Sequence, residues 1–530
     1  MLIIDNVTSI MPEFYSEVNM GSTIEIKSED MSLENLKTQG LILGVFEGEA
    51  LSGDSAKYLD KLYGGTISSL IESGEIRGEL KEFHILHRVD LPIAKIIILG
   101  CGKREKFNRD TVRFLAAKGA RTARKAGQTE SSFLLEPYGS LSAFDLGVVA
   151  AEGLIMGLDR FENYKTKKKS SRDKLNSFVV LGNGFDPEEL KSGLDRGEIL
   201  GQGNVCARQI ANHPGNYMTP SQLAAEAQGV AAEAGMECVI LDEPELKEKG
   251  FGGICAVSAG SAENCKMVQL FYRGKPADKT VHLAIIGKGL TFDAGGISIK
   301  PAQNMHMMKF DMCGGAGVIG AAQIIGKLKP ALNINIYIPT SENLLGPESY
   351  KPGDVLTMYG GKSVEIKNTD AEGRLLLADA ISLAVEHGAE RIINTATLTG
   401  AVLGALGHWR TGLMCRDDEL KALVTESGNQ CDELLWELPL DAEYRVILHS
   451  AVADISNSGS RFAGATTAGI FLNEFAGDTP FCHLDIAGTA WVENVPSQYN
   501  FKPYLPKEGA TGTIARTIAI AAEKIANEIS

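Results

Sequence analysis

Side chains that could do chemistry are concentrated in three short, glycine-rich segments of the chain. The segments are KGLTFDAGGISIK at 288–300, MKFDMCGG at 308–315 and NTDAEGR at 368–374. Their four carboxylates are Asp293, Asp311, Asp370 and Glu372. Brought together, these acids would repel one another strongly unless cations lay among them. Hard oxygen ligands suit Mn²⁺, Mg²⁺ or Zn²⁺, and several bridging carboxylates suit a pair of metals about 3.5–4 Å apart.

Each of these acids alone has a simpler explanation, because single aspartates and glutamates usually cap helices or form surface ion pairs. Their joint occurrence at glycine-rich strand ends, beside the cations Lys288, Lys300 and Arg374, favours a metal site instead. The residue types leave the reaction open, because they fit a two-metal phosphatase as well as a peptidase. The zinc-protease motif HExxH and the serine-hydrolase motif GxSxG do not occur in the sequence.

The spacing within the segments indicates how the acids must be positioned. Asp370 and Glu372 are two residues apart, so they point the same way only on an extended stretch. We therefore expect both to leave a strand just before a helix begins, with Gly373 allowing the turn. Lys288 and Asp293 lie among glycines at 287, 289, 295 and 296, which predicts a tightly folded loop.

Alternating strands and helices are predicted around these segments, and together they indicate an α/β protein. In the N-terminal part we expect strands at 94–100 and 176–181 and helices at 109–126 and 187–212. In the C-terminal part we expect strands at 281–286, 306–310, 334–338, 391–397 and 481–486, and helices at 314–328, 372–387 and 466–475. This rhythm predicts a central mixed sheet flanked by helices on both faces.

Two domains are expected, because 530 residues are too many for one ordinary core. His213-Pro214-Gly215 should end the long helix, so we place the boundary near it. The prediction is a smaller N-terminal α/β domain at 1–185, a linker helix at 186–215 and a larger C-terminal α/β catalytic domain at 216–530.

Composition narrows the class of protein further. No apolar run reaches 18 residues and the first residues do not form a secretory signal, so we expect a cytoplasmic protein without a membrane span. Nine scattered cysteines without a CxxC pair fit reduced thiols. A net charge of −15 argues against nucleic-acid binding by the whole surface, without excluding it. The basic run at 165–174 is interpreted as a solvated loop.

The third segment extends to NTDAEGRL at 368–375, which resembles the signature of the leucine aminopeptidase, or cytosol aminopeptidase, family. The likeness continues through NTATLTG at 394–400 and HLDIAG at 483–488, and it covers essentially all of residues 200–500. It implies a metal-dependent aminopeptidase that releases N-terminal leucine and other apolar residues from peptides. It also implies a homohexamer.

The resemblance further implies a role for each predicted ligand. One divalent ion, Mn²⁺ or Zn²⁺, would be held by Lys288, Asp293, Asp311 and Glu372, and a second by Asp293, Asp370 and Glu372. Lys288 would have to lose its proton before it could act as a ligand.

Two further cations would take part in catalysis rather than in metal binding. Lys300 would stabilise the oxyanion that forms when metal-activated water attacks the scissile carbonyl. Arg374 would hold a bicarbonate ion that acts as the general base. An ordinary helix-start ion pair is the alternative for Arg374, but the N-terminus of a helix favours an anion over a structural cation.

Four residues match positions that line the family's pocket for the first substrate side chain: Met308, Thr397, Gly400 and Ala487. For Met308 and Ala487, core packing is the alternative. Ala294 departs from the family, which usually has serine there, and the change would remove a hydrogen bond beside the ligands. We still expect activity. The competing hypotheses are an additional DNA-binding regulatory role and a catalytically inactive structural homologue.

Overall fold

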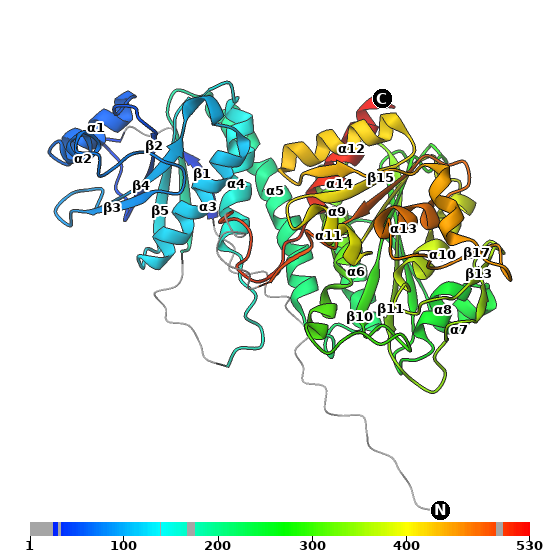
Figure 1. Ribbon diagram of the computed structural model, residues 1–530. Coiled ribbons are helices and arrows are strands. Elements are labelled where there is room, and N and C mark those ends of the chain that lie inside the picture. Colours follow the sequence, from blue (N-terminus) through cyan, green and yellow to red (C-terminus); the bar gives the residue numbers. More distant parts are fainter. Residues whose placement is uncertain (1–24, 30–32, 138, 167–174, 494–501, 530) are drawn as a thin grey trace, which may run out of the picture. The chain divides into compact units, whose positions relative to one another are not determined.

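The computed structural model describes residues 25–29, 33–137, 139–166, 175–493 and 502–529 (Figure 1). The chain forms two compact units. The first comprises Met1–Thr111, Lys118–Gly147 and Leu158–Leu194, and the second comprises Val112–Ala117, Val148–Gly157 and Asp195–Ser530. Residues 167–174, which make up most of the basic run predicted to be a solvated loop, lie outside the described residues.

A six-stranded sheet forms the first unit, in the order β1-β6-β5-β2-β4-β3. Its strands are β1 (Glu25–Glu29), β2 (Leu41–Phe46), β3 (Phe83–His87), β4 (Lys95–Gly102), β5 (Glu130–Leu135) and β6 (Ser177–Gly182). Neighbours run parallel except β3, which is antiparallel to β4. The helices between them are α1 (Asp54–Leu62), α2 (Thr66–Glu72), α3 (Arg109–Lys125) and α4 (Ala143–Leu158). β4 is buried on both faces, as its apolar run predicts for a strand covered by helices on both sides.

The long helix α5 (Pro187–Asn212) has the bounds that the sequence predicts. Pro187 occupies its first position, where a missing backbone N–H costs nothing. Glu188 and Glu189 in the first turn interact favourably with the helix dipole. The helix begins in the first unit and ends in the second.

A nine-stranded mixed sheet forms the second unit, in the order β16-β15-β18-β14-β9-β11-β8-β7, with β10 paired to β11. Its strands are β7 (Glu237–Leu241), β8 (Lys266–Arg273), β9 (Leu283–Gly287), β10 (Gly289–Asp293), β11 (Asn333–Asn343), β14 (Ile392–Ala396), β15 (Thr411–Cys415), β16 (Leu435–Glu437) and β18 (Phe481–Asp485). The centre of the sheet, from β10 and β11 to β18, is parallel. The carboxyl ends of these strands therefore meet at one edge.

Helices cover both faces of this sheet, and the alternation of side chains along each strand explains the two layers. Ile285 of β9 packs in a cluster with α6, α9, α12 and α14, whereas Ile286 packs in a second cluster with α8, α10 and α13. These helices are α6 (Pro220–Ala234), α8 (Gly252–Ser258), α9 (Cys313–Leu328), α10 (Gly373–Glu386), α12 (Asp418–Cys431), α13 (Gly464–Asn473) and α14 (Ala515–Glu528). Figure 1 shows the strands running between the two groups. The predicted two-domain α/β fold, with a mixed sheet flanked by helices, is confirmed.

One predicted strand is wrong. Residues 306–310 form a 3₁₀ helix, Met305–Phe310, instead of an extended segment. Asn304 turns the chain in front of it with a left-handed φ of 62°, and Met307 and Phe310 are buried three residues apart on one side of the helix. A short apolar run does not distinguish a strand from a buried helical turn.

The loop predicted around Lys288 is shorter than expected. Residues Gly289–Asp293 form strand β10, which pairs in parallel with the end of β11. The chain turns only after Asp293, where Gly295 and Gly296 have φ of 86° and 65°. Residues other than glycine rarely adopt these positive φ values, so the turn depends on this glycine pair.

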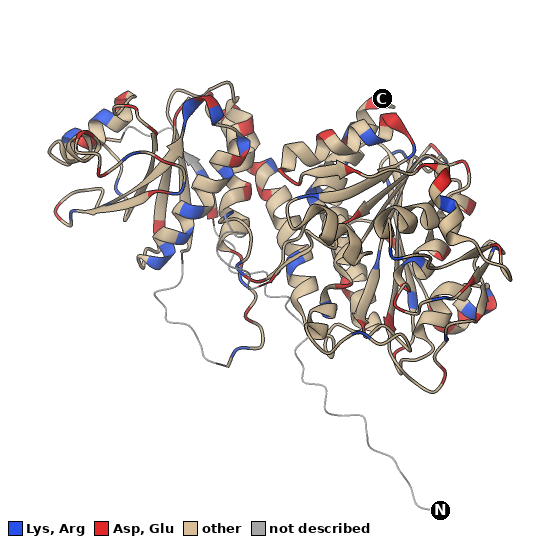
Figure 2. Ribbon diagram, viewed as in Figure 1, with Lys and Arg blue, Asp and Glu red and all other residues tan. Residues whose placement is uncertain are grey.

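Charged side chains of both signs are interspersed along the helices and loops of each unit (Figure 2). The net charge of the protein is −15, and a number of its basic residues are paired with acids, such as Arg109 with Asp145 and Arg196 with Glu523. Among the described residues, no helix is both long and apolar enough to cross a bilayer.

Candidate metal centre

The predicted ligands come from separate elements at one edge of the sheet in the second unit. Lys288 lies between β9 and β10, and Asp293 ends β10. Asp311 lies between the 3₁₀ helix and α9, and Asp370 and Glu372 precede α10. Turn residues separate this last pair from β13 (Ser363–Glu365), so the expected exit directly from a strand is wrong. The carboxyl edge of a parallel sheet is where open α/β folds bind ligands.

Lys288 lies at the centre of one half of the site, and only 2% of its side chain is exposed. Its Nζ donates to Asp311 Oδ2 at 2.8 Å, to Glu372 Oε1 at 2.9 Å and to the Thr397 carbonyl at 3.2 Å. Burial lowers the pKa of Lys288, but Asp311 and Glu372 raise it further, so the balance lies above the ordinary value. Without a metal, Lys288 is therefore an ammonium ion.

Lys300 is the cation of the other half of the site, where it pairs with Asp293 and Asp370. Its Nζ lies 2.7 Å from Asp293 Oδ2 and also pairs with Asp370 Oδ1. The second oxygen of Asp293, Oδ1, accepts hydrogen bonds from the Gly295 N–H and from Asn343 Nδ2, both at 2.8 Å. Asp293 is thus held on one side by fixed donors, and it faces the site on the other.

Positive charge is scarce in this cluster. Four carboxylates share it with two lysines, which leaves a net charge of −2 when every acid is ionised. Burial and the neighbouring Glu372 and Asp311 raise the pKa of Asp293 to about 8. Burial likewise raises the pKa of Asp311 to about 6. The carboxyls would ionise more readily if further cations were bound.

The set of donors fits divalent cations. Oxygen atoms of Asp293, Asp370 and Glu372 lie within 4.8 Å of one another, close enough for one ion to contact all three. Carboxylate oxygens suit Mn²⁺ or Zn²⁺, and a dication supplies the charge that burial makes scarce. The Lys288 amine can join such a donor set once it has lost its proton.

Arg374 lies in the first turn of α10 and is buried, with 8% of its surface exposed. Its Nη1 donates to the Asn457 carbonyl at 2.7 Å. Its Nε–H has no hydrogen-bond partner within the described part of the chain. Burial lowers the pKa of Arg374 to about 10, so it remains a cation at neutral pH. A buried guanidinium with a free donor beside a helix N-terminus is suited to bind an anion.

Two of the residues predicted to line the substrate pocket contact a predicted ligand. Thr397 Oγ1 donates to Asp311 Oδ1 at 2.7 Å. The Met308 carbonyl accepts the Asp311 N–H at 3.2 Å, and the Met308 side chain is half-buried. Thr397 is therefore positioned by the ligand cluster itself, and Met308 by the turn that leads into Asp311.

The other two predicted pocket residues are connected through the buried acid Asp485. Its carboxylate accepts the Ala487 N–H at 3.2 Å and the Thr399 hydroxyl at 2.7 Å. Thr399 in turn caps helix α11 (Gly400–Leu406), whose first residue, Gly400, is exposed. Asp485 thus connects the HLDIAG segment to the NTATLTG segment. No role was predicted for it from the sequence.

Comparison with protein-family models decides the family. The model of the catalytic domain of the cytosol aminopeptidase family matches residues 205–519, and the model of the family's N-terminal domain matches residues 42–168. The chain belongs to the cytosol aminopeptidase family. It is therefore a metal-dependent aminopeptidase, a hydrolase that removes residues from the N-termini of peptides.

Curated relatives and solved structures agree with this assignment. A probable cytosol aminopeptidase of Solibacter usitatus is 40% identical over 499 residues, which cover 94% of this chain and 98% of that protein. A probable cytosol aminopeptidase of Alkaliphilus metalliredigens is 39% identical, over 93% of this chain and 98% of that one. A mutant of tomato leucine aminopeptidase matches with a TM-score of 0.85 and 29% identity, over 96% of this chain and 98% of that chain.

A second solved structure, the bottromycin maturation enzyme BotP in complex with Mn, matches with a TM-score of 0.81 and 28% identity. It covers 92% of this chain and 100% of that chain. The family resemblance inferred from NTDAEGRL is confirmed. These relatives support a peptidase, and their names give no support to the alternative role in DNA binding.

Two buried polar residues of this aminopeptidase contact the site and were not predicted. Asn343 ends β11 and donates to Asp293, and the Tyr350 hydroxyl donates to the Thr369 carbonyl at 2.8 Å. The sequence holds one signal for Asn343, a run of polar residues (SEN) that follows the apolar centre of the strand. Nothing local marks Tyr350.

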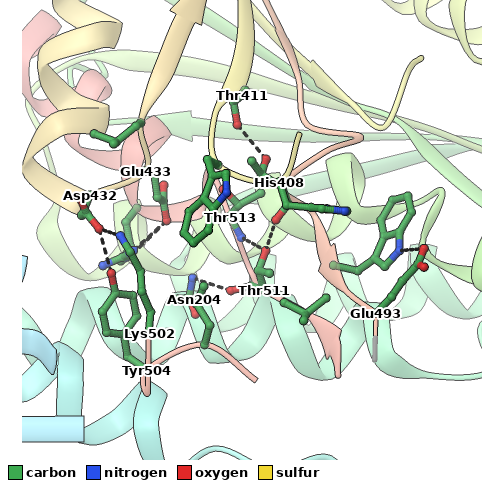
Figure 3. Close-up of a pocket in the computed structure, with 17 residues that line it drawn as sticks. Asn204, His408, Thr411, Asp432, Glu433, Glu493, Lys502, Tyr504, Thr511 and Thr513 are labelled. Atoms are coloured by element: carbon green, nitrogen blue, oxygen red, sulfur yellow. Dashed lines mark hydrogen bonds and ion pairs between the residues drawn. The ribbon is translucent and has the colours of Figure 1, made fainter. Parts of the chain in front are cut away.

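A cavity of about 100 Å³ lies elsewhere in the second unit (Figure 3). Its lining shares no residue with the carboxylate cluster. The acids in its wall are already paired, because Asp432 contacts Lys502 and Glu433 Oε1 lies 2.9 Å from Arg516 Nη2. The cavity is therefore separate from the carboxylate cluster at the sheet edge.

Proposed function

We propose that this aminopeptidase releases N-terminal leucine and other apolar residues from peptides, using two divalent cations in each subunit. The observation that carries the proposal is the shortage of positive charge in the site. Four acids face two lysines, and three of those acids bring oxygens within 4.8 Å of one another. Divalent cations relieve this shortage.

The ligands can be assigned from the contacts and the family resemblance. Lys288, Asp293, Asp311 and Glu372 would hold one ion, and Asp293, Asp370 and Glu372 the second. When bound, the ions supply a water that is activated near neutral pH, and they polarise the scissile carbonyl. The complex of BotP with Mn supports Mn²⁺ as the first choice, with Zn²⁺ as the alternative.

Lys300 is proposed to stabilise negative charge on the carbonyl oxygen of the substrate. Its side chain is 21% exposed and reaches Asp293 from the open side of the cluster. Burial lowers the pKa of Lys300, but Asp293 and the other carboxylates raise it above its ordinary range. The group therefore stays protonated at neutral pH, as the stabilisation of an oxyanion requires.

Arg374 is proposed to bind bicarbonate through its free Nε–H. The hydrogen bond from Nη1 to the Asn457 carbonyl fixes the plane of the guanidinium, so Nε keeps its direction. The N-terminus of α10 adds a favourable field for a negative charge. A bicarbonate ion held here supplies a general base.

The first side chain of the substrate is proposed to lie against Met308, Thr397, Gly400 and Ala487. Met308 and Ala487 are half-buried, so each leaves apolar surface open. Gly400 is exposed and has no side chain, which leaves room for an aliphatic group of leucine size. Apolar contact of this kind favours leucine over charged residues, because a charge would be buried without a partner.

One sample of the protein, assayed for both activity and metal content, tests the proposal. After loading with Mn²⁺ or Zn²⁺ it should contain two ions per subunit and hydrolyse leucine p-nitroanilide, and chelation should abolish the reaction. Asp370→Ala and Glu372→Ala should each lower kcat/KM by roughly 100-fold or more, because each removes a ligand. Full activity in either variant, or a metal content near zero in the loaded protein, would refute the site.

The family resemblance also supports a homohexamer, and residence in the cytoplasm remains part of the same expectation. Light scattering at micromolar concentration should give a mass near six times 56.8 kDa. A monomer under these conditions would contradict this part of the proposal. The proposal for the metal site would be unaffected, because the assay of activity and metal content tests it separately.

A further inference from the structure

We propose that Asn343 is a positioning residue that holds two ligand-bearing segments of the metal site in place. The inference rests on the proposed function, because it assigns Asn343 a task only if Asp293 and Asp370 are ligands. Asn343 has no exposed surface, and it contributes no carboxylate to the site. Its effect is transmitted through the groups that its amide contacts.

The register of the sheet brings Asn343 to the site. β10 and β11 run parallel, and Asp293 and Asn343 are paired in the last position of both strands. Paired residues point to the same face of a sheet, so the amide lies beside the carboxylate. β11 is buried along all eleven of its residues, which leaves the backbone of Asn343 little freedom to move.

The orientation of the amide is set by its neighbours. Nδ2 donates to Asp293 Oδ1 at 2.8 Å and to the Thr369 carbonyl at 3.0 Å. Both amide hydrogens are therefore used. The opposite orientation would place the amide oxygen against two acceptors, so it is excluded.

The first of these bonds orients Asp293. Asn343 Nδ2 and the Gly295 N–H both donate to Oδ1, which leaves Oδ2 directed at Lys300 Nζ, 2.7 Å away. Rotation of the carboxylate would break two hydrogen bonds at once. Oδ2 is thus the oxygen of Asp293 that faces the cluster.

The second bond holds the segment that carries Asp370. The Thr369 carbonyl accepts from Asn343 and also from the Tyr350 hydroxyl, at 2.8 Å. The Thr369 hydroxyl donates to the Gly295 carbonyl at 2.6 Å, which ties this segment to the turn after β10. The Asn343 amide thus donates both to Asp293 and to the backbone of the segment that carries Asp370.

The buried amide of Asn343 lowers the stability of the fold, so a stabilising role does not account for it. Its Oδ1 has no hydrogen-bond partner among the residues that the structure describes. An unpaired amide oxygen in a buried strand lowers stability, and leucine has a similar shape without the penalty. The presence of asparagine here is explained if its two donated hydrogen bonds hold the ligand-bearing segments.

Isothermal titration of the metal-free protein with Mn²⁺ tests the inference without relying on activity. Asn343→Leu should weaken Mn²⁺ binding by roughly 10–100-fold, the range found when groups that orient metal ligands are removed. Tyr350→Phe removes the second donor to Thr369 but leaves Asp293 held, so its loss should be smaller. Thr340→Val is the matched control on the same strand, because the buried Thr340 hydroxyl has no partner among the described residues, and it should bind like wild type.

The outcomes separate this inference from the proposed function. Wild type that binds no Mn²⁺ would refute both. Wild type that binds two ions with Asn343→Leu within twofold of its affinity would refute the positioning role alone. The thermal unfolding midpoint of each variant in chelator shows whether the apo fold is intact. If the leucine variant does not fold, Asn343→Ala carries the same prediction.

Discussion

Gly373 illustrates how closely the residues of the cluster are fitted together. It follows Glu372 at the start of α10, and a Cβ at this position would lie 2.5 Å from Lys288 Nζ and 2.6 Å from Lys288 Cε. Atoms do not approach so closely, so the ammonium group would have to leave its place. The glycine is required for space rather than for an unusual backbone angle.

Gly373→Ala should therefore weaken Mn²⁺ binding by roughly 10–100-fold, because it displaces a proposed ligand without removing any. Titration calorimetry measures the loss. Gly229→Ala is the matched control, since Gly229 lies within α6 and an added Cβ there meets nothing within 4 Å. The control should bind Mn²⁺ like wild type. It should unfold at a slightly higher temperature, because alanine favours the helix. Equal affinities of the two variants would show that Lys288 takes no part in binding.

Asp379 shows how one helix of the second unit stabilises another. It lies within α10 and is fully buried. Its Oδ2 accepts the Ile254 N–H in the first turn of α8 at 2.9 Å, and its Oδ1 accepts the Tyr359 N–H at 2.8 Å. The N-cap residue of α8, Phe251, provides no side-chain hydrogen bond. The start of α8 is thus capped from a different helix.

Asp379→Asn should lower the free energy of unfolding by about 1–3 kcal/mol, because one oxygen becomes an NH₂ group that faces a backbone donor. Urea denaturation provides the measurement. Asp417→Asn is the control, because Asp417 caps α12 through a single bond from the Leu420 N–H at 2.7 Å, and asparagine caps equally well. An equal loss in both variants would argue against the capping role of Asp379.

Prolines, glycines and apolar runs in the sequence predict much of this fold. The predictions that fail concern residues whose structure depends on distant parts of the chain or on ambiguous short runs. Pro187 and the proline and glycine at 214–215 mark the ends of α5, so its bounds follow from the sequence. The glycine-rich segments likewise mark the acids of the site. Asn343 and Asp485 were missed because their contacts depend on strand register, which joins residues far apart in the chain. Residues 306–310 were assigned wrongly because five apolar and basic residues fit both a strand and a turn of helix.

At the scale of the whole molecule, a buried ionic cluster joins distant parts of the second unit. Glu152 lies between Arg113, whose Nη2 is 2.6 Å away, and Arg516, whose Nη1 is 3.1 Å away. The three side chains are at most 3% exposed. Burial raises the pKa of Glu152, but the two arginines lower it further, so the balance lies below its ordinary value of 4.5. Removing the acid would take away the carboxylate between two buried cations, of which Arg516 keeps its ion pair with Glu433.

Glu152→Gln should lower the free energy of unfolding at pH 7 by about 3–5 kcal/mol, the usual loss when one partner of a buried pair is removed. Because the folded-state pKa of Glu152 is depressed, its contribution is complete above the unfolded value of 4.5 and is lost as pH falls through the lower folded value. The difference between variant and wild type should therefore shrink below pH 4.5 in urea titrations. Glu528→Gln, which removes an exposed pair with Arg391, should have a far smaller effect at any pH. A difference for Glu152→Gln that stays constant with pH would contradict this account.

If Lys288 is a metal ligand, as proposed above, metal loading of this aminopeptidase exchanges a proton for a cation. Lys288 and Lys300 are internal counterions of the four acids of the cluster. Uptake of the cation beside Lys288 must then release a proton to the solvent. Affinity for the cation should consequently rise with pH.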